Sequence, residues 1–433
     1  MIFNEWRLGE MSGTPNLKVG ILSDVQGYAY KGDWGMHNCE NVLKFLAEKQ
    51  VDVILMAGDL ADGGDDPAPI AYYYDLVKKY FGDKMPQLVN CAGNHDFWTH
   101  ANVSGKTQDQ AFKDFCEAIH DPVEDPCRKT IGGYDFIGFS SNNEKNYSEE
   151  DCQKLIPVLE DCVRRDPVKP IFIVTHFHPK NTVVSSHGGS GRTGLRAVMD
   201  RFPQVVSFSG HTHCPLEDER CIWQGEFTAI NTGALSYACV PERFVNNCGP
   251  IIPFAREGIG FMTMDLYDDH LEIRRFNAED LHEIKADKPW TVTIPHKPEN
   301  AIYTDARKAQ RTAPRFRDDA QMLMRLDYGF VYLIFDEAEH DDFTHSYRLT
   351  MTDLESGKVM ETKYISNFYR LERNRDPRQV FRIPPNTLKK GKRYRFDVYP
   401  VETFGNEGAP LTLEADIPVT YPFANREEIG PQE

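Results

Sequence analysis

Across its 433 residues, the sequence lacks any hydrophobic run near the ~20 residues that a membrane-spanning helix needs. Its first 16 residues contain charges, glycine and proline, and they lack an apolar stretch of signal-peptide length. These absences predict no membrane partner and a cytoplasmic location, although a leader already removed would leave the same sequence.

Cysteine pairs with metal-binding or redox spacing are also absent. The ten cysteines all lie between Cys39 and Cys248, and no two of them form a C-x-x-C pair. This argues against a zinc knuckle and against a thioredoxin-like motif. Cysteines in apolar surroundings, such as Cys91, are typical of buried free thiols. We therefore expect reduced cysteines rather than a disulfide framework.

Positive charge is scarce. The chain has 49 Lys and Arg against 66 Asp and Glu, which gives a net charge of −17. Residues from Ala301 onward contribute only −2 to this charge. Such an acidic surface disfavours duplex nucleic acid, because the backbone phosphates would be repelled. A small anion would still bind where a metal ion supplies local positive charge. A hydrophobic fraction of 40% excludes a disordered chain.

Short apolar runs alternate with helical patterns in the first part of the chain, and strands dominate after residue 222. Strands are expected at residues 17–23, 51–56, 87–91, 171–175, 205–209, 227–232, 260–266 and 271–276, with a hairpin over 130–140. Helices are expected at 38–49, 69–80, 107–119 and 148–165, the last kinked or divided by Pro157. This order indicates an α/β sandwich of mixed sheets.

The last third of the chain reads as a separate all-β unit. Short strands are expected at residues 330–335, 344–352, 358–364, 379–383, 393–399 and 411–417. Their number and spacing fit a β-sandwich of the immunoglobulin or fibronectin type III kind. Prolines punctuate the stretch before it. The predicted organisation is a first domain over 1–285, a linker over 286–300 and a β-sandwich domain over 301–433.

Polar motifs directly follow five of the predicted strands. They are Asp24-Val25-Gln26, Gly58-Asp59, Gly93-Asn94-His95-Asp96, Thr175-His176 and Gly210-His211-Thr212-His213. Ligands of open α/β sheets bind outside the carboxyl ends of the strands, so these side chains would converge on one edge. Carboxylates, amides and imidazoles together suit Mn²⁺, Fe or Zn²⁺, and there are enough of them for two ions.

Taken jointly, these motifs resemble the signature of the calcineurin-like metallophosphoesterases. The resemblance spans about residues 18–276 and implies a four-layer α/β/β/α sandwich with two divalent metal ions. It implies a first metal site of Asp24, Gln26, Asp59 and His213 and a second of Asn94, His176 and His211, bridged by Asp59. It also implies that His95 assists the leaving group, that Asp96 orients His95, and that an activated hydroxide is the nucleophile.

One position departs from the family pattern. The first motif usually reads Asp-x-His, and here its third residue is Gln26. An amide oxygen is a weaker ligand than imidazole, so Gln26 either binds the metal directly or contacts it through water. Some relatives that act on nucleotide diphosphate derivatives are similar in carrying Gln there.

Two further residues are candidates for substrate contacts. His178 lies two residues beyond His176, and Arg192 lies in the glycine-rich stretch HGGSGRTG, where a guanidinium would grip a phosphate. The alternative for Arg192 is a solvated loop. Asp96 is also open to a purely structural role.

The sequence thus predicts metal-dependent hydrolysis of a phosphate ester of a small molecule. A phosphodiester or a pyrophosphate, as in a nucleotide, is favoured through the Gln26 resemblance. The alternatives are a phosphomonoesterase of the same family and a scaffold of low activity whose β-sandwich binds protein or glycan.

Overall fold

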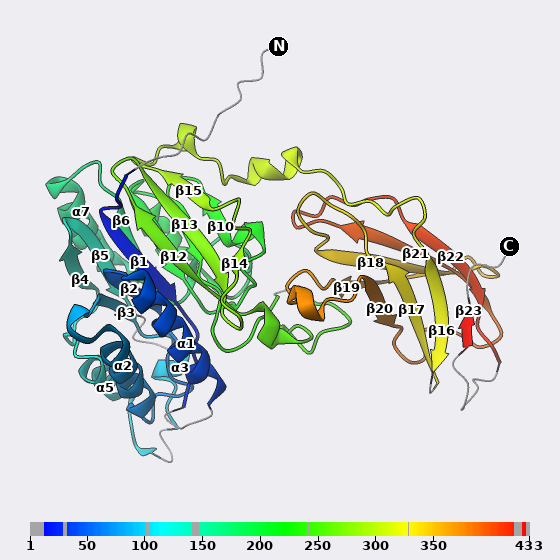
Figure 1. Cartoon of the computed structure of the whole chain (residues 1–433), viewed down its shortest axis with the longest axis horizontal. Helices are drawn as coiled ribbons and strands as arrows, with labels where there is room; N and C mark the ends of the chain where they lie inside the picture. Colours follow the sequence, from blue (N-terminus) through cyan, green and yellow to red (C-terminus); the bar gives the residue numbers. More distant parts are fainter. Residues whose placement is uncertain are drawn as a thin grey trace, which may run out of the picture.

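The computed structural model describes residues 13–28, 33–100, 104–140, 147–240, 242–327, 329–419 and 427–429. Figure 1 shows two units arranged along the long axis of the molecule, a mixed α/β unit and then a unit made of strands. Both units are built around strands that are hydrophobic on their inner faces, as the sequence pattern predicts.

The first sheet of the α/β unit has seven strands. Their order is β14-β13-β12-β1-β2-β3, and β15 also pairs with β13. β1, β2 and β3 run parallel, and β12 joins β1 in the antiparallel sense. The bounds are β1 (Leu17–Leu22), β2 (Val53–Ala57), β3 (Gln87–Cys91), β12 (Gly260–Leu266), β13 (His270–Asn277), β14 (Glu283–Ile284) and β15 (Trp290–Thr293).

The second sheet has six strands in the order β10-β11-β9-β6-β5-β4. β5, β6, β9 and β11 are parallel, with antiparallel strands at both edges. The bounds are β4 (Cys127–Ile131), β5 (Tyr134–Phe139), β6 (Ile171–Thr175), β9 (Val205–Ser209), β10 (Ile222–Gln224) and β11 (Thr228–Asn231). A small separate pair consists of β7 (His178–Pro179) and β8 (Gly191–Arg192).

Helices cover the outer faces of both sheets. Their bounds are α1 (Trp34–Lys49), α2 (Ala68–Phe81), α3 (Asn94–Phe97), α5 (Gln108–Ala118), α6 (Glu149–Gln153), α7 (Leu155–Arg165) and α8 (Thr193–Met199). One buried cluster lies between the two sheets, a second joins the first sheet to α1, α2 and α5, and a third joins the other sheet to α7 and α8. The layers are therefore α/β/β/α, as the resemblance implies.

The predicted helix over 148–165 is divided, and Pro157 explains where. α6 ends at Gln153 and α7 begins at Leu155. Proline has no backbone N–H, so Pro157 cannot donate to the carbonyl of Gln153 four residues earlier. It is tolerated in the first turn of α7, where the N–H groups have no helical partner.

The second unit consists of two four-stranded antiparallel sheets, β20-β17-β16-β23 and β19-β18-β21-β22. The six predicted strands are present, and β16 and β23 are additional. The bounds are β16 (Met322–Asp327), β17 (Phe330–Asp336), β18 (Ser346–Asp353), β19 (Val359–Ile365), β20 (Arg378–Arg382), β21 (Arg393–Val401), β22 (Leu411–Asp416) and β23 (Glu427–Ile429). One hydrophobic cluster fills the space between the sheets.

The stretch 286–300, expected to be a linker, differs from that expectation. Residues 290–293 form β15, which pairs with β13 and so extends the first sheet. Trp290 is buried, and its indole nitrogen donates to Glu219 at 3.0 Å. Prolines 289 and 295 lie just outside the strand and do not remove a ladder hydrogen bond from it.

Two expectations about the whole chain can be compared with the structure. All ten cysteines are free, and Cys248 is the exposed one among them. In the described part of the chain, no helix combines the length and the apolar character that crossing a membrane requires.

Candidate metal centre

The fold brings the five polar motifs to one edge of the two packed sheets. Each motif follows a parallel strand, namely β1, β2, β3, β6 or β9. Side chains from these turns line a cavity of about 460 Å³ together with the loop at 185–190. The predicted ligands that line it are Gln26, Asp59, Asn94, His211 and His213.

The turns that carry these ligands have an unusual backbone. Asp24, Asp59 and His211 have φ angles of 52°, 53° and 71°, in the left-handed region. Gln26 and His213 share this conformation, with φ of 45° and 50°. It is uncommon in residues other than glycine, and it is retained where the surroundings fix it, often at functional sites.

The most compact group of ligand atoms belongs to Asp59, His176 and His211. One atom of each lies within 4.8 Å of the others. His176 Nε2 is 3.2 Å from Asp59 Oδ2 and 3.3 Å from His211 Nδ1. Asn94 joins the group, because its Oδ1 lies 3.0 Å from His176 Nε2. This mixture of oxygen and nitrogen atoms fits a divalent cation.

A backbone carbonyl fixes the orientation of His176. Its Nδ1–H donates to the carbonyl oxygen of Ala57 at 2.9 Å. A carbonyl can only accept, so the proton is on Nδ1 and Nε2 is directed at Asp59 and His211. Metal-ligating imidazoles are commonly held in this way by their other ring nitrogen.

A second group of ligand atoms comes from Asp24 and His213. His213 Nε2 is 3.1 Å from Asp24 Oδ1, and its Nδ1–H donates to the carbonyl of Tyr237 at 2.8 Å. Asp24 is fully buried and accepts the backbone N–H of His211 at 2.9 Å. His211 therefore connects the two groups of ligands, because its side chain belongs to the first group and its backbone N–H binds Asp24 of the second.

Gln26 lies at the border of the cavity. Its Oε1 accepts a hydrogen bond from Ser236 Oγ at 3.1 Å, and its side chain also contacts the Tyr237 hydroxyl.

The charges of the cluster are strongly interdependent. Burial would raise the pKa of Asp59, but the imidazoles of His176, His95 and His211 outweigh it and hold that pKa well below its usual range. Burial would lower the pKa of His176, yet Asp59 and Asp24 raise it to about 9. Burial and the neighbouring His176 push the pKa of His211 well down. The buried Asp59 carboxylate thus requires a positive charge beside it, which is an environment that binds a cation.

His95 lies at the mouth of the cavity with a carboxylate partner that the sequence analysis missed. Its Nδ1 is 3.1 Å from Oδ1 of Asp62, and its backbone N–H donates to Asp59 at 2.8 Å. Asp62 also accepts a hydrogen bond from the Tyr28 hydroxyl. The sequence feature that could have indicated this partner is the position of Asp62, three residues after Asp59 in the same turn.

Asp96 does not orient His95, contrary to the role that the resemblance implies. Its buried carboxylate accepts backbone N–H groups of Gly93 at 2.8 Å, Ala61 at 2.9 Å and Leu60 at 3.3 Å. These bonds tie the turn that carries Asn94 and His95 to the turn after β2. The structure therefore gives Asp96 a structural task, and Asp62 takes the place predicted for it.

Neither of the two predicted substrate contacts is among the described residues that line the cavity. His178 is fully buried, and its Nε2 forms a hydrogen bond with the Thr212 hydroxyl at 2.9 Å, so it supports the turn between His211 and His213. Burial is the main cause that lowers the pKa of His178 to about 3. Arg192 stacks on Phe177, 3.7 Å from the ring centroid, and donates to the Gly189 carbonyl.

Comparisons with known proteins agree with the motif pattern. Residues 17–215 match the model of the calcineurin-like phosphoesterase family. No curated protein sequence matches the chain. A dimetal phosphatase from Danio rerio is 12% identical, with a TM-score of 0.43, and the match covers 65% of this chain and 99% of that one. Purple acid phosphatase PPD1 from yellow lupin seeds is 15% identical, with a TM-score of 0.44 and coverage of 65% and 55%.

The family model and the geometry concern the same residues. The matched range contains the strands β1, β2, β3, β6 and β9 and the ligand-bearing turns that follow them. Residues 17–215 thus match the calcineurin-like phosphoesterases, a family of phosphoric ester hydrolases that use bound metal ions.

Proposed function

We propose that this protein hydrolyses a phosphodiester or pyrophosphate bond of a small molecule, using two divalent metal ions. Asp24, His213 and Gln26 would hold one ion, and Asn94, His176 and His211 the other, with Asp59 shared. When bound, the ions supply the positive charge that activates water and neutralises phosphate oxygens. Mn²⁺, Fe and Zn²⁺ all suit this donor set.

His95 would give the proton to the oxygen of the leaving group. Burial lowers its pKa, but the carboxylates of Asp62 and Asp59 outweigh burial and raise that pKa to about 9. Its ring lines the cavity, where Asp62 at 3.1 Å would stabilise the protonated form. A positioned acid of this kind typically contributes about 10²–10⁴-fold to the rate.

The absence of lysine and arginine from the described lining of the cavity favours a diester over a monoester. None of the described residues that line it is Lys or Arg. A phosphomonoester dianion carries one more negative charge than a diester, and further cations in the site would balance that charge. The lack of Lys and Arg among the described lining residues is the observation that supports a diester as the substrate.

The test uses protein stripped with a chelator and then loaded with Mn²⁺. Release of p-nitrophenol is measured from bis(p-nitrophenyl) phosphate and from p-nitrophenyl phosphate. We expect hydrolysis that depends on the metal and is faster for the diester. Faster hydrolysis of the monoester would contradict the choice of substrate class, and no hydrolysis of either would contradict the assigned function.

Two variants separate the roles within the site. His95→Ala should lower kcat and leave the bound metal content unchanged, whereas Asp59→Asn should lower both. Metal content is measured by elemental analysis of the same preparations. Full activity in either variant would overturn the role given to that residue.

A further inference from the structure

A second cavity opens directly beside the metal centre. It has a volume of about 730 Å³ and is lined mainly by one stretch at 251–257 together with the start of α1. Gln26 and Tyr237 line both this cavity and the metal site. A molecule with its phosphate at the metal ligands can therefore extend past these two side chains into the second cavity, which we call the aromatic groove.

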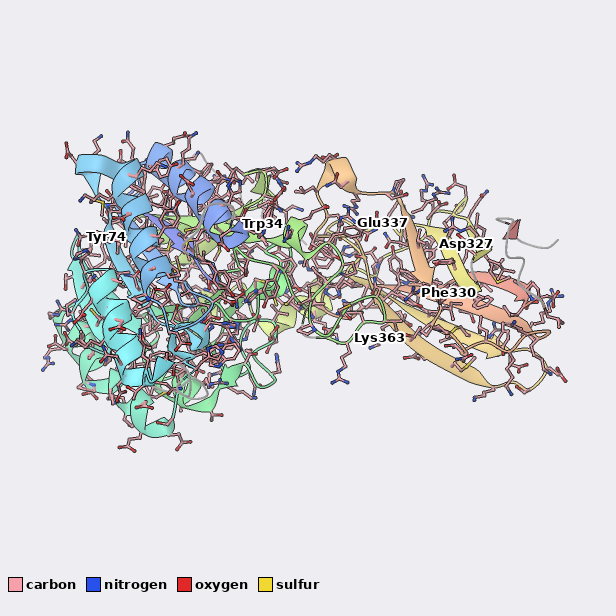
Figure 2. All side chains as sticks on the ribbon, turned by 90° about the horizontal axis from the view of Figure 1, so that it is seen from below. Trp34, Tyr74, Asp327, Phe330, Glu337 and Lys363 are labelled. Atoms are coloured by element: carbon pink, nitrogen blue, oxygen red, sulfur yellow. The ribbon has the colours of Figure 1, made fainter. Side chains whose placement is uncertain are left out.

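The groove presents large apolar side chains to solvent. Phe254 is 63% exposed and Ile251 is 41% exposed. Trp34 is fixed in place, because its indole N–H donates to the Ser236 carbonyl at 3.1 Å. Figure 2 shows Trp34 on the side of the first unit that is turned toward the β-sandwich. Exposed apolar surface gathered beside an active site is typical of a binding surface.

The backbone at Phe254 supports a functional interpretation. Its φ and ψ are 55° and 39°, a left-handed conformation that is exceptional for a bulky aromatic residue. Such conformations persist only where the surroundings impose them, and they cluster at binding sites. The result is an aromatic ring held outward at the wall of the groove.

Residues of the second unit hold this wall. The Arg370 guanidinium lies 3.7 Å from the Phe254 ring centroid and pairs with Glu257 at 2.8 Å. The hydroxyl of Tyr369 donates to the Pro253 carbonyl at 2.8 Å. A hydrophobic cluster of both units lies beneath, formed by Ala238, Val240, Phe244, Ile252, Phe343, Ile365, Phe368 and Tyr369.

One cationic side chain, Arg256, lines the groove beside the carboxylates Asp33, Asp62 and Glu257. Arg256 is exposed and lies 4.6 Å from the Trp34 ring centroid. In a chain with a net charge of −17, this cation adds local attraction for an anion that enters beside it.

We propose that the aromatic groove binds a planar ring of the substrate, with Phe254 as a specificity-determining residue. The ring belongs to one of the two groups esterified to the phosphate, and it is a nucleobase or an aryl group. The three carboxylates of the groove have partners within the protein: Asp33 caps a helix, Asp62 lies beside His95, and Glu257 pairs with Arg370. Recognition therefore relies on stacking, which accepts different bases. This inference rests on the proposed diesterase function.

The test compares two diesters with the same scissile bond, thymidine 5′-(p-nitrophenyl phosphate) and methyl p-nitrophenyl phosphate. Phe254→Ala should lower kcat/KM about 10-fold through KM, because stacking is lost equally from the ground and transition states. A loss confined to the thymidine diester assigns the groove to the nucleobase. An equal loss for both diesters assigns it to the aryl ring, which they share. No loss for either overturns the proposal.

Controls separate this result from general damage. Phe254→Tyr keeps a ring and should retain the wild-type KM, and Tyr72→Ala removes an exposed aromatic side chain of α2 far in sequence from the groove. Arg370→Lys keeps a cation for Glu257 but removes the planar face under Phe254, so it should raise KM less than Phe254→Ala does.

Failure of the proposed function would be seen separately. If the wild-type protein hydrolyses neither diester, equilibrium binding to the Mn²⁺-loaded protein replaces turnover. Thymidine monophosphate or phenyl phosphate should bind more tightly than inorganic phosphate, and Phe254→Ala should remove that difference. Equal binding of all three ligands would overturn the groove proposal as well.

Discussion

Replacing Asp96 with alanine distinguishes a structural role from a chemical one. The carboxylate is 1% exposed and accepts three backbone N–H groups, from Gly93, Ala61 and Leu60. Alanine would leave these donors buried without a partner. The turn carrying Asn94 and His95 would then be held less firmly against the turn after β2.

The size of the effect follows from these bonds. A hydrogen bond to a charged group contributes about 1.5–3 kcal/mol, so two short bonds and one long bond give about 5 kcal/mol. Removing the carboxylate also removes the cost of burying its charge. Burial and the neighbouring Asp59 raise the pKa of Asp96 to about 7, so part of the loss is offset. We expect the free energy of unfolding to fall by about 1–3 kcal/mol, the cost of leaving a buried donor without a partner.

The assay is urea denaturation of metal-free protein, so that metal binding does not contribute to the measured stability. Asp83→Ala is the matched control, because Asp83 is exposed in a short 3-10 helix, and it should change stability by less than about 0.5 kcal/mol. If Asp96→Ala kept the wild-type stability and lowered only kcat, the structural argument would be refuted.

Three further predictions concern metal binding and stability. Removal of divalent ions should lower the Tm measured by calorimetry, and Mn²⁺ should restore it. At a hundredfold excess of Mn²⁺ over Kd, the ion should add about 2.7 kcal/mol to the free energy of unfolding. A Tm that does not change with metal would contradict the site. Glu219→Gln should lower the free energy of unfolding by about 3 kcal/mol in urea denaturation, because Glu219 pairs with buried Arg275 at 3.0 Å and with Lys285 at 2.7 Å. An unchanged urea midpoint would show that these two ion pairs do not contribute to stability. Burial raises the pKa of Asp125 to about 8, above its unfolded value, so the wild-type protein should lose stability relative to Asp125→Asn as pH rises from about 4 to 8. A constant difference in Tm between the wild type and Asp125→Asn from pH 4 to 8 would contradict this link between protonation of Asp125 and stability.

Much of the fold follows from local sequence patterns. Continuous apolar runs such as Ile171–Thr175 and Val205–Ser209 predict buried parallel strands with their observed bounds. The ligand-bearing turns follow the ends of such strands, which is why Asp59 and His176 could be assigned to one edge before their contact was known. Pro157 marked the divided helix because its effect is local.

Other features depend on tertiary contacts and left no clear pattern in the sequence. β15 is a four-residue strand flanked by prolines, and its place in the first sheet depends on burial of Trp290 against Glu219. Asp62 acquires its role only when the turn after β2 meets His95. His178 resembled a ligand because it lies close to His176 in sequence, yet burial directs it toward Thr212.

The wall of the aromatic groove shows the limit of local inference most clearly. Glu257 and Arg370 are 113 residues apart, and their ion pair helps to fix the segment that turns Phe254 outward. Neither domain's sequence alone predicts a left-handed phenylalanine, because the contacts that hold it come from both. A substitution in the β-sandwich at Arg370 would therefore change substrate affinity at a metal centre whose ligands all lie in the other domain. Under the proposal for the aromatic groove, the second unit contributes to the substrate site.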